Sequence, residues 1–321
     1  MVKALNLALR QEMEADPDVL VIGEDVGVDG GVFRVTEDLQ RAFGSRRVID
    51  SPLAEAAIVG TSIGMALYGL KPVCEIQFSG FAFQCFHHFE NHAARYRMRT
   101  QGRFHVPVVV RMPFGGGVRA LEHHSESEEQ FYAHVPGLKI VVPSGPRNAR
   151  ALLVSAIRDP DPVIFFEHKA LYHASREEVP DEPEALPLGQ ARVVREGSAL
   201  TLIAYGAMLR VAREAAETLA REDRVEAEVI DLLTISPLDR ETIVASVSKT
   251  GRAVIVHEAP GSFGAGAEIA ASLMEGAFLS LEAPIRRVTA YDVPFVGFAR
   301  ERANVPDAAR VVAAARETLA Y

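Results

Sequence analysis

A single carboxylate, Glu55, stands where a helix is expected to begin, directly after the string Ser-Pro-Leu-Ala. The expected helix carries Gly60 and Gly64 one turn apart. Because glycine costs up to ~1 kcal/mol inside a helix, this pair indicates a close approach of another helix. The functional interpretation is a carboxylate held at the start of a helix that packs tightly against another helix. The alternative, which the spacing alone favours, is an acidic residue placed in a first turn by the helix dipole.

Three more candidates lie just beyond expected strands. Gln77 and Phe81 follow the apolar string Cys-Glu-Ile, at the end of an open parallel sheet where ligands bind. The pattern around Phe81 equally suits a core residue of the next helix, and favours that alternative. His124 follows a strand and a glycine-rich loop, a position suited to proton transfer or substrate contact. A loop histidine without a role remains the alternative.

Short apolar runs and longer helical patterns must position these residues. Strands are predicted at 19–23, 72–78, 107–112, 138–143 and 162–166, and helices at 53–69, 82–100 and 146–158. Strands that are apolar along their whole length and alternate with helices are typical of a parallel sheet covered on both faces. The predicted fold class is therefore α/β.

The composition changes after the last of these strands. Residues 175–190 are rich in proline and acidic residues, as linkers are, and strand–helix alternation then resumes. We therefore expect a first domain at 1–174, a linker at 175–197 and a smaller α/β domain at 198–321. The second domain is predicted to hold strands at 201–206, 225–232 and 253–258, and helices at 207–222, 239–249, 264–277 and 306–319.

The charge balance excludes some classes of function. Lys and Arg number 34 against 43 Asp and Glu, and this net charge of −9 argues against a nucleic-acid partner, which would require basic surface. The longest uncharged stretch has 15 residues, fewer than the ~20 that a membrane span needs. The N-terminal sequence lacks the apolar run of a signal peptide. We therefore expect no membrane association, and a location in a bacterial cytoplasm.

Six longer strings, in order along nearly the whole chain, resemble the β chain of thiamine-diphosphate-dependent 2-oxo acid dehydrogenases. They are VIDSPLAEAAIVGTSIGMALYGLKPVCEIQF, PGLKIVVPSGP, IRDPDPVIFFEHKALY, VIDLLTISPLD, HEAPGSFGAGAEIA and APIRRVTAYDVPF. The resemblance implies a pyrimidine-binding-type parallel-sheet domain followed by a transketolase C-terminal-type α/β domain. The strings EIQF, FFEHKALY, VIDLLT and HEAP resemble the branched-chain type more than the pyruvate type.

The resemblance also assigns roles around thiamine diphosphate. Glu55 matches the glutamate whose carboxyl shares a proton with the pyrimidine ring and so activates the cofactor. Leu53 and Ala54 match residues that line the cofactor, Gln77 a polar contact, and Phe81 the aromatic residue that faces the pyrimidine.

On the substrate side, the resemblance assigns Glu24, Phe78, Phe81 and His124, the last as a catalytic residue that assists transfer of the acyl group. Glu126 stands near His124 where the family has an amide. A nearby anion would favour imidazolium, so we expect Glu126 to raise the pKa of His124.

Half of the cofactor site is expected on another chain. The G-D-G…N motif that holds Mg²⁺ and the diphosphate in thiamine enzymes is absent here. The resemblance implies that a partner α subunit supplies it, in an assembly of two α and two β chains that serves a lipoyl-bearing acyltransferase core. It also implies a structural K⁺ near Val109 and Ala156, through their carbonyls, and near Asp159 and Asp161.

The function expected from these matches is oxidative decarboxylation of branched-chain 2-oxo acids, with transfer of the acyl group to a lipoyl carrier. A β subunit that serves pyruvate or acetoin is the alternative within the family, since those members share the catalytic residues. A non-catalytic subunit that only assembles a complex is the alternative from a different class.

Overall fold

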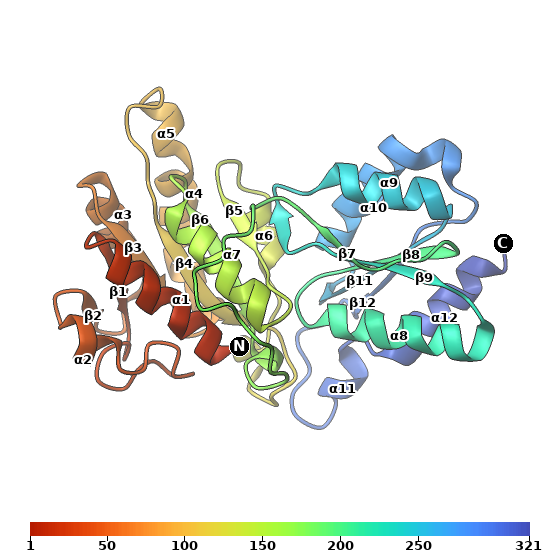
Figure 1. The fold of residues 1–321 in the computed structure, drawn as a ribbon, viewed down its shortest axis with the longest axis horizontal. Coiled ribbons are helices and arrows are strands. Elements are labelled where there is room, and N and C mark those ends of the chain that lie inside the picture. The colour runs from red at the N-terminus through yellow and green to blue at the C-terminus, as the bar shows by residue number, and fades with distance from the viewer.

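Two β-sheets lie side by side in the computed structural model, which describes residues 1–321 (Figure 1). The first sheet has the order β10-β5-β6-β4-β3-β1-β2. Its strands are β1 (Val19–Gly23), β2 (Val48–Asp50), β3 (Lys71–Glu75), β4 (Val109–Phe114), β5 (Lys139–Val141), β6 (Val163–His168) and β10 (Thr234–Ser236). The second sheet has the order β12-β11-β8-β9-β7. Its strands are β7 (Arg192–Arg195), β8 (Leu200–Ala204), β9 (Ala227–Asp231), β11 (Ala253–Pro260) and β12 (Arg286–Ala290).

Helices connect these strands and cover both sheets. The α-helices are α1 (Val2–Ala15), α2 (Leu39–Phe43), α3 (Glu55–Leu67), α4 (Phe86–Asn91), α5 (Tyr96–Arg99), α6 (Glu129–Ala133), α7 (Pro146–Arg158), α8 (Met208–Asp223), α9 (Arg240–Thr250), α10 (Ala265–Ala277), α11 (Glu301–Asn304) and α12 (Ala308–Leu319). Short 3-10 helices are η1 (Ser79–Cys85), η2 (Ala93–Arg95), η3 (Glu122–His124), η4 (Lys169–Leu171) and η5 (Phe278–Ser280). All strand pairs are parallel except β10 with β5 and β7 with β9. The predicted α/β class is confirmed.

The two halves of the chain share one sheet. β10 comes from the second half but pairs with β5 of the first, with Thr234 opposite Val141. The amide of Val142 also donates to the carbonyl of Leu233 at 2.8 Å. This three-residue strand is too short to show an apolar pattern in the sequence. Its pairing with the neighbouring strand is what makes it a strand.

Two local predictions differ from the structure. The end of the range expected as a linker, 175–197, forms the edge strand β7, which pairs with β9. The continuous helix expected at 82–100 is instead a succession of short helical turns from η1 to α5. His92, with φ −118° and ψ −74°, departs from ideal α-helical angles and divides α4 from η2.

Two apolar cores lie on opposite sides of the sheets, and each contains residues from both sheets. One core joins the buried faces of α1, α7, α8 and α12, and the other those of α3, α9 and α10. Burial of apolar surface therefore holds the two halves together as well as each half by itself.

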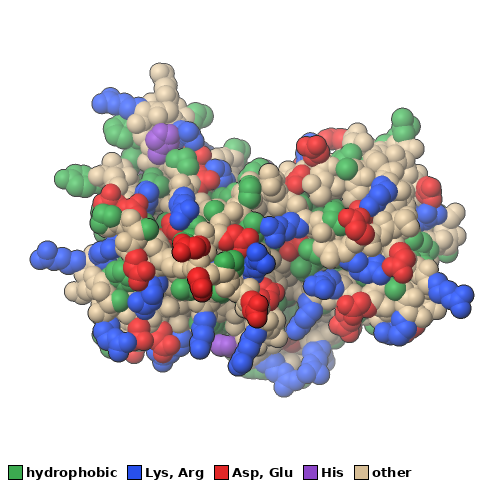
Figure 2. Space-filling view, in the orientation of Figure 1, with side chains coloured by type: hydrophobic (Ala, Val, Ile, Leu, Met, Phe, Trp, Pro, Cys, Tyr) green, Lys and Arg blue, Asp and Glu red, His purple; other side chains and the backbone are tan.

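The surface carries charges of both signs. On the face in Figure 2, Lys and Arg side chains are interspersed with Asp and Glu. The helices are all too short or too polar to cross a lipid bilayer.

Candidate functional site

Glu55 is buried at the edge where the parallel strands β1, β2 and β3 end. It is the first residue of α3, and four residues separate that helix from β2. Only 5% of Glu55 is exposed, and its Oε2 atom has no hydrogen-bond partner. Because a buried polar atom without a partner is costly, it indicates a position at which another group completes the site.

Two more polar residues from the prediction lie at the same edge. Glu24 follows β1, and burial together with the charges of Asp25 and Glu55 raises its pKa. Gln77 follows β3, and its Nε2 atom donates to Oδ2 of Asp25 at 3.2 Å. The structure thus gathers an acidic group, with an amide beside it, at the carboxyl ends of adjacent strands.

Next to this group, Phe78, Phe81 and His124 form an aromatic cluster. The ring centroids of Phe78 and His124 are 4.1 Å apart, those of Phe81 and His124 are 5.3 Å apart, and those of Phe78 and Phe81 are 5.7 Å apart. Phe81 belongs to η1, which packs against α3 and so joins the cluster to the Glu55 helix. Phe81 also packs against a core cluster, as the alternative interpretation expected.

Leu53 and Ala54 precede Glu55 at the surface of this site. Leu53 is 66% exposed, which is unusual for a leucine. Ala54 is the residue before α3 and is partly buried. An exposed leucine beside a buried, unpaired carboxylate fits a position that a ligand or a partner chain covers.

The electrostatic surroundings of His124 differ from the prediction. Burial, His123 and Lys169, in decreasing order, lower the pKa of His124. The expectation that Glu126 would raise this pKa is wrong, because Glu126 acts on Glu128 instead. Burial first, and then Glu126, raise the pKa of the Glu128 carboxyl to about 8. His124 is consequently neutral near pH 7.

Lys169 was missed by the sequence reasoning. Its side chain is buried, its Nζ atom has no hydrogen-bond partner, and this atom lies 5.9 Å from the centroid of the Phe78 ring. Burial lowers the pKa of Lys169 to about 8. The signal that could have found it is its position directly after β6, in the string FFEHKALY.

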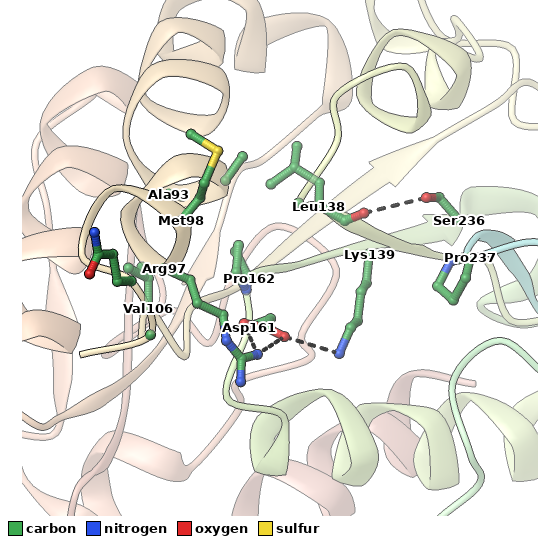
Figure 3. A pocket seen from close by; sticks show the side chains of 14 residues that line it. Ala93, Arg97, Met98, Val106, Leu138, Lys139, Asp161, Pro162, Ser236 and Pro237 are labelled. Carbon is green, nitrogen blue, oxygen red and sulfur yellow. Dashed lines mark hydrogen bonds and ion pairs between the residues drawn. The ribbon is translucent and has the colours of Figure 1, made fainter. Parts of the chain in front are cut away.

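The residues expected to bind K⁺ do not suit a cation. Figure 3 shows Arg97 and Lys139 converging on Asp161 beside a cavity of about 670 Å³. Both carboxylate oxygens of Asp159 accept from Lys139 at 2.7 Å. Nearby, Ala156 already accepts the amide of Asp159 through its carbonyl, and Val109 is buried inside β4. Both acids are therefore already neutralised by basic side chains, and we assign no K⁺ to them.

Comparisons with known proteins identify the family and the fold. The family "Transketolase, pyrimidine binding domain" matches residues 1–174, and "Transketolase, C-terminal domain" matches residues 189–311. A solved structure, "Split gene transketolase, inactive beta4 tetramer", superposes with a TM-score of 0.81 over 99% of this chain and 97% of that chain. At 23% identity, that structure supports the fold alone. The fold and the site thus define a protein of the transketolase-like, thiamine-diphosphate-dependent class.

More similar relatives narrow the class. The chain is 50% identical to a protein of Staphylococcus epidermidis and 49% identical to one of Staphylococcus aureus, each named "Pyruvate dehydrogenase E1 component subunit beta". Both alignments cover 100% of this chain and 98% of the relative. The chain belongs to the family of E1 β subunits of 2-oxo acid dehydrogenases. The relatives carry the pyruvate name and not the branched-chain name that the sequence strings favoured.

Proposed function

We propose that this chain is the β subunit of a decarboxylating E1 component and supplies the proton-sharing half of a thiamine diphosphate site. The observation that carries the proposal is Glu55, whose buried Oε2 atom lacks a partner at the edge where the strands end. A carboxylate oxygen held at this position suits the pyrimidine ring of the cofactor, because a ring nitrogen can share a proton with it. When bound, the cofactor supplies a nucleophilic carbon and accepts the electron pair left by decarboxylation.

The residues around Glu55 have matching tasks. Phe81 offers an aromatic face for the pyrimidine, and Leu53 with Ala54 covers its edge. Gln77, oriented by Asp25, provides a polar contact. Glu24 lies close enough for the charge of Glu55 to help raise the Glu24 pKa, after burial and the charge of Asp25.

His124 is the second catalytic residue of the proposal. A neutral imidazole beside Phe78 and Phe81 can accept a proton at one nitrogen and donate one at the other. Its Nδ1 atom is buried without a partner, so it is available to a substrate-side group. In the overall reaction the 2-oxo acid loses CO₂, its acyl carbon is oxidised, and the disulfide of a lipoyl group is reduced to a thiol and a thioester.

An α subunit is the proposed partner, in an assembly of two α and two β chains, with Mg²⁺ and the diphosphate held on the α side. This part of the proposal rests on the missing G-D-G…N motif. The lipoyl-bearing acyltransferase core is the proposed acceptor of the acyl group.

For the substrate, we propose pyruvate, the acid in the names of relatives that are about half identical over the full chain. A branched-chain 2-oxo acid is the second candidate, because the strings EIQF, FFEHKALY, VIDLLT and HEAP favour it. The two acids differ by two methyl groups, and each methylene-sized difference is worth only ~1–3 kcal/mol in a pocket.

The test is 2-oxo acid decarboxylation with an artificial electron acceptor, thiamine diphosphate and Mg²⁺. The chain is assayed alone and after co-purification with an α subunit, with pyruvate and 3-methyl-2-oxobutanoate in parallel. We expect activity only in the pair, with a higher kcat/KM for pyruvate. A preference for the branched acid would overturn the substrate, and activity of the chain alone would overturn the shared site.

A further inference from the structure

The segment that carries His124 is a loop whose two ends are tied together. The amide of Gly115 donates to the carbonyl of Glu126 at 2.9 Å, so residues 115–126 form a closed loop. His124 lies two residues before that tie. Any displacement at the base of the loop is therefore transmitted to His124 over a short length of chain.

The base of this loop lies against the second half of the chain. The amide of Gly116 donates to Oε1 of Glu258 at 2.5 Å, and the amide of Gly117 donates to Oε1 of Glu301 at 2.5 Å. Glu258 lies on β11 and Glu301 begins α11. Both carboxylates are buried, with 5% and 4% exposure, and they hold consecutive amides from one side.

Close packing explains why this base is made of glycines. Gly115 has φ +77°, and a Cβ atom there would lie 2.4 Å from Nε2 of His168. A Cβ atom on Gly116 would lie 2.6 Å from the ring of Phe295. A side chain at either position would collide with these rings, so glycine lets the base of the loop lie close to them.

Two basic residues accompany the carboxylates. His168, at the end of β6, lies with Nε2 at 2.8 Å from Oε2 of Glu258, which links the two sheets. Lys169 follows it, and its charge interacts with those of Glu258 and Glu301. Because Lys169 also lies over the ring of Phe78, which contacts His124, the charged groups reach the aromatic cluster as well as the loop.

We infer that Glu258 and Glu301 are positioning residues, through which the C-terminal domain holds the 115–126 loop and sets the place of His124 for acyl transfer. Neither carboxylate belongs to the cofactor edge, so their effect on the reaction runs through the loop. The inference rests on the proposed function only in its choice of His124 as the group that is positioned.

The test compares Glu301→Ala with Glu301→Gln in the enzyme co-purified with its α subunit. Alanine deletes the acceptor for Gly117 and keeps a good helix former at the start of α11, whereas glutamine keeps an acceptor oxygen. The control is Glu268→Gln, an exposed residue of α10 paired with Arg240 on the surface. Hydrogen exchange of the 115–126 peptide, decarboxylation with an artificial acceptor and acyl transfer to a lipoyl domain are measured for each.

We expect Glu301→Ala to accelerate exchange in residues 115–126 and to reduce acyl transfer ~10- to 100-fold, the scale of a catalytic group displaced by about 1 Å. Decarboxylation should fall by much less, and glutamine should restore acyl transfer. Unchanged exchange and unchanged transfer in the alanine variant would overturn the inference. Should the alanine variant fail to fold, Glu301→Asp, which shortens the reach but keeps the charge, is read by the same criteria.

His124→Ala separates this inference from the proposed function. If that variant retains acyl transfer, the role of His124 is wrong, while faster exchange in Glu301→Ala still shows that the carboxylate holds the loop. If His124→Ala loses acyl transfer and Glu301→Ala keeps it, the positioning role is wrong and the proposed function stands.

Discussion

Two buried groups of charges at the same edge of the first sheet differ in how completely they are paired. Arg111 on β4 is enclosed by Glu75 and Glu167 through three hydrogen bonds, from Nη1 to Glu75 at 2.7 Å and from Nε and Nη2 to Glu167 at 2.7 and 2.8 Å. The hydroxyl of Tyr172 also donates to Glu167 at 2.7 Å. A few strands away, Glu55 has a buried carboxylate oxygen with no partner at all.

This difference indicates a structural role for the paired Arg111 group and a functional role for the residues with unpaired atoms. The Arg111 group has its hydrogen-bond partners within the chain, and these offset the cost of taking its charges out of water. Glu55, His124 and Lys169 each keep a buried polar atom unpaired. A cofactor, a substrate or a partner subunit that pairs with these atoms would relieve the penalty of leaving them unpaired.

The largest effect is expected from Glu55→Gln. The amide keeps the size of the side chain but cannot share a proton as a carboxyl does, so decarboxylation in the assembled enzyme should fall by a factor of ~10³ or more. Binding of the α subunit and the melting temperature should stay close to those of the parent enzyme. A variant with full turnover would instead identify the chain as a non-catalytic assembly subunit.

Arg111→Met should break the paired group, and its effect should appear in stability. Removal of the guanidinium leaves Glu75 and Glu167 buried together, and burial already raises the pKa of Glu75. We expect unfolding to become easier by ~3–5 kcal/mol, as for other buried pairs that lose one partner. Because the chain has no tryptophan, urea unfolding is followed by circular dichroism.

The control for this variant is Arg147→Met. Arg147 pairs with Glu184 at the surface, where it is about half exposed. Its removal should cost less than ~1 kcal/mol, because water screens an exposed pair. Equal losses in the two variants would contradict the assignment of a structural role to the Arg111 group.

Parts of this comparison could be predicted from the sequence. The apolar run at 19–23 and the amphipathic stretch at 146–158 coincide with β1 and α7, because each pattern is satisfied within the segment itself. Glu55 could be named because it opens an expected helix inside a string that resembles a known family, and His124 because it follows an expected strand and a glycine-rich loop. The gathering of Glu24, Glu55 and Gln77 at one edge follows from parallel strands whose carboxyl ends meet.

Other parts could not be predicted, because they depend on contacts between distant segments. The strands β7 and β10 are short, and only pairing with β9 and β5 makes them strands. Lys169 and Glu301 look like ordinary charged residues in the sequence. Only the fold shows that both are buried, that Glu301 accepts from Gly117 of the 115–126 loop and that Lys169 lies over Phe78. The expectation that Glu126 raises the pKa of His124 rests on their closeness in the sequence. In the structure, the side chain of Glu126 instead raises the pKa of Glu128.

Glu128→Gln tests another buried carboxyl that has an oxygen without a hydrogen-bond partner. The pKa of Glu128 is raised to about 8, so the stability that its protonated form contributes is complete below its ordinary pKa of 4.5 and is lost as the pH rises through 8. Glutamine mimics the protonated carboxyl at every pH. The variant should therefore match the parent at pH 5 and exceed it by about 1–3 kcal/mol at pH 8.5. Urea unfolding at both pH values checks this, and parallel pH curves would contradict it.

The smallest effect is expected from exchanging K⁺ for Na⁺, because Asp159 and Asp161 already have cationic partners of their own. Lys139 lies 2.7 Å from Asp159, and Arg97 lies 2.6 Å from Asp161. A monovalent cation would have to displace an ammonium or a guanidinium that the fold holds in place. The melting temperature of the purified enzyme should therefore be the same in either salt at equal ionic strength. A melting temperature that is higher in K⁺ than in Na⁺ would show that K⁺ binds at these carboxylates in spite of their basic partners. Lys139→Met removes one basic partner from each of Asp159 and Asp161. A difference between the two salts should appear first in this variant.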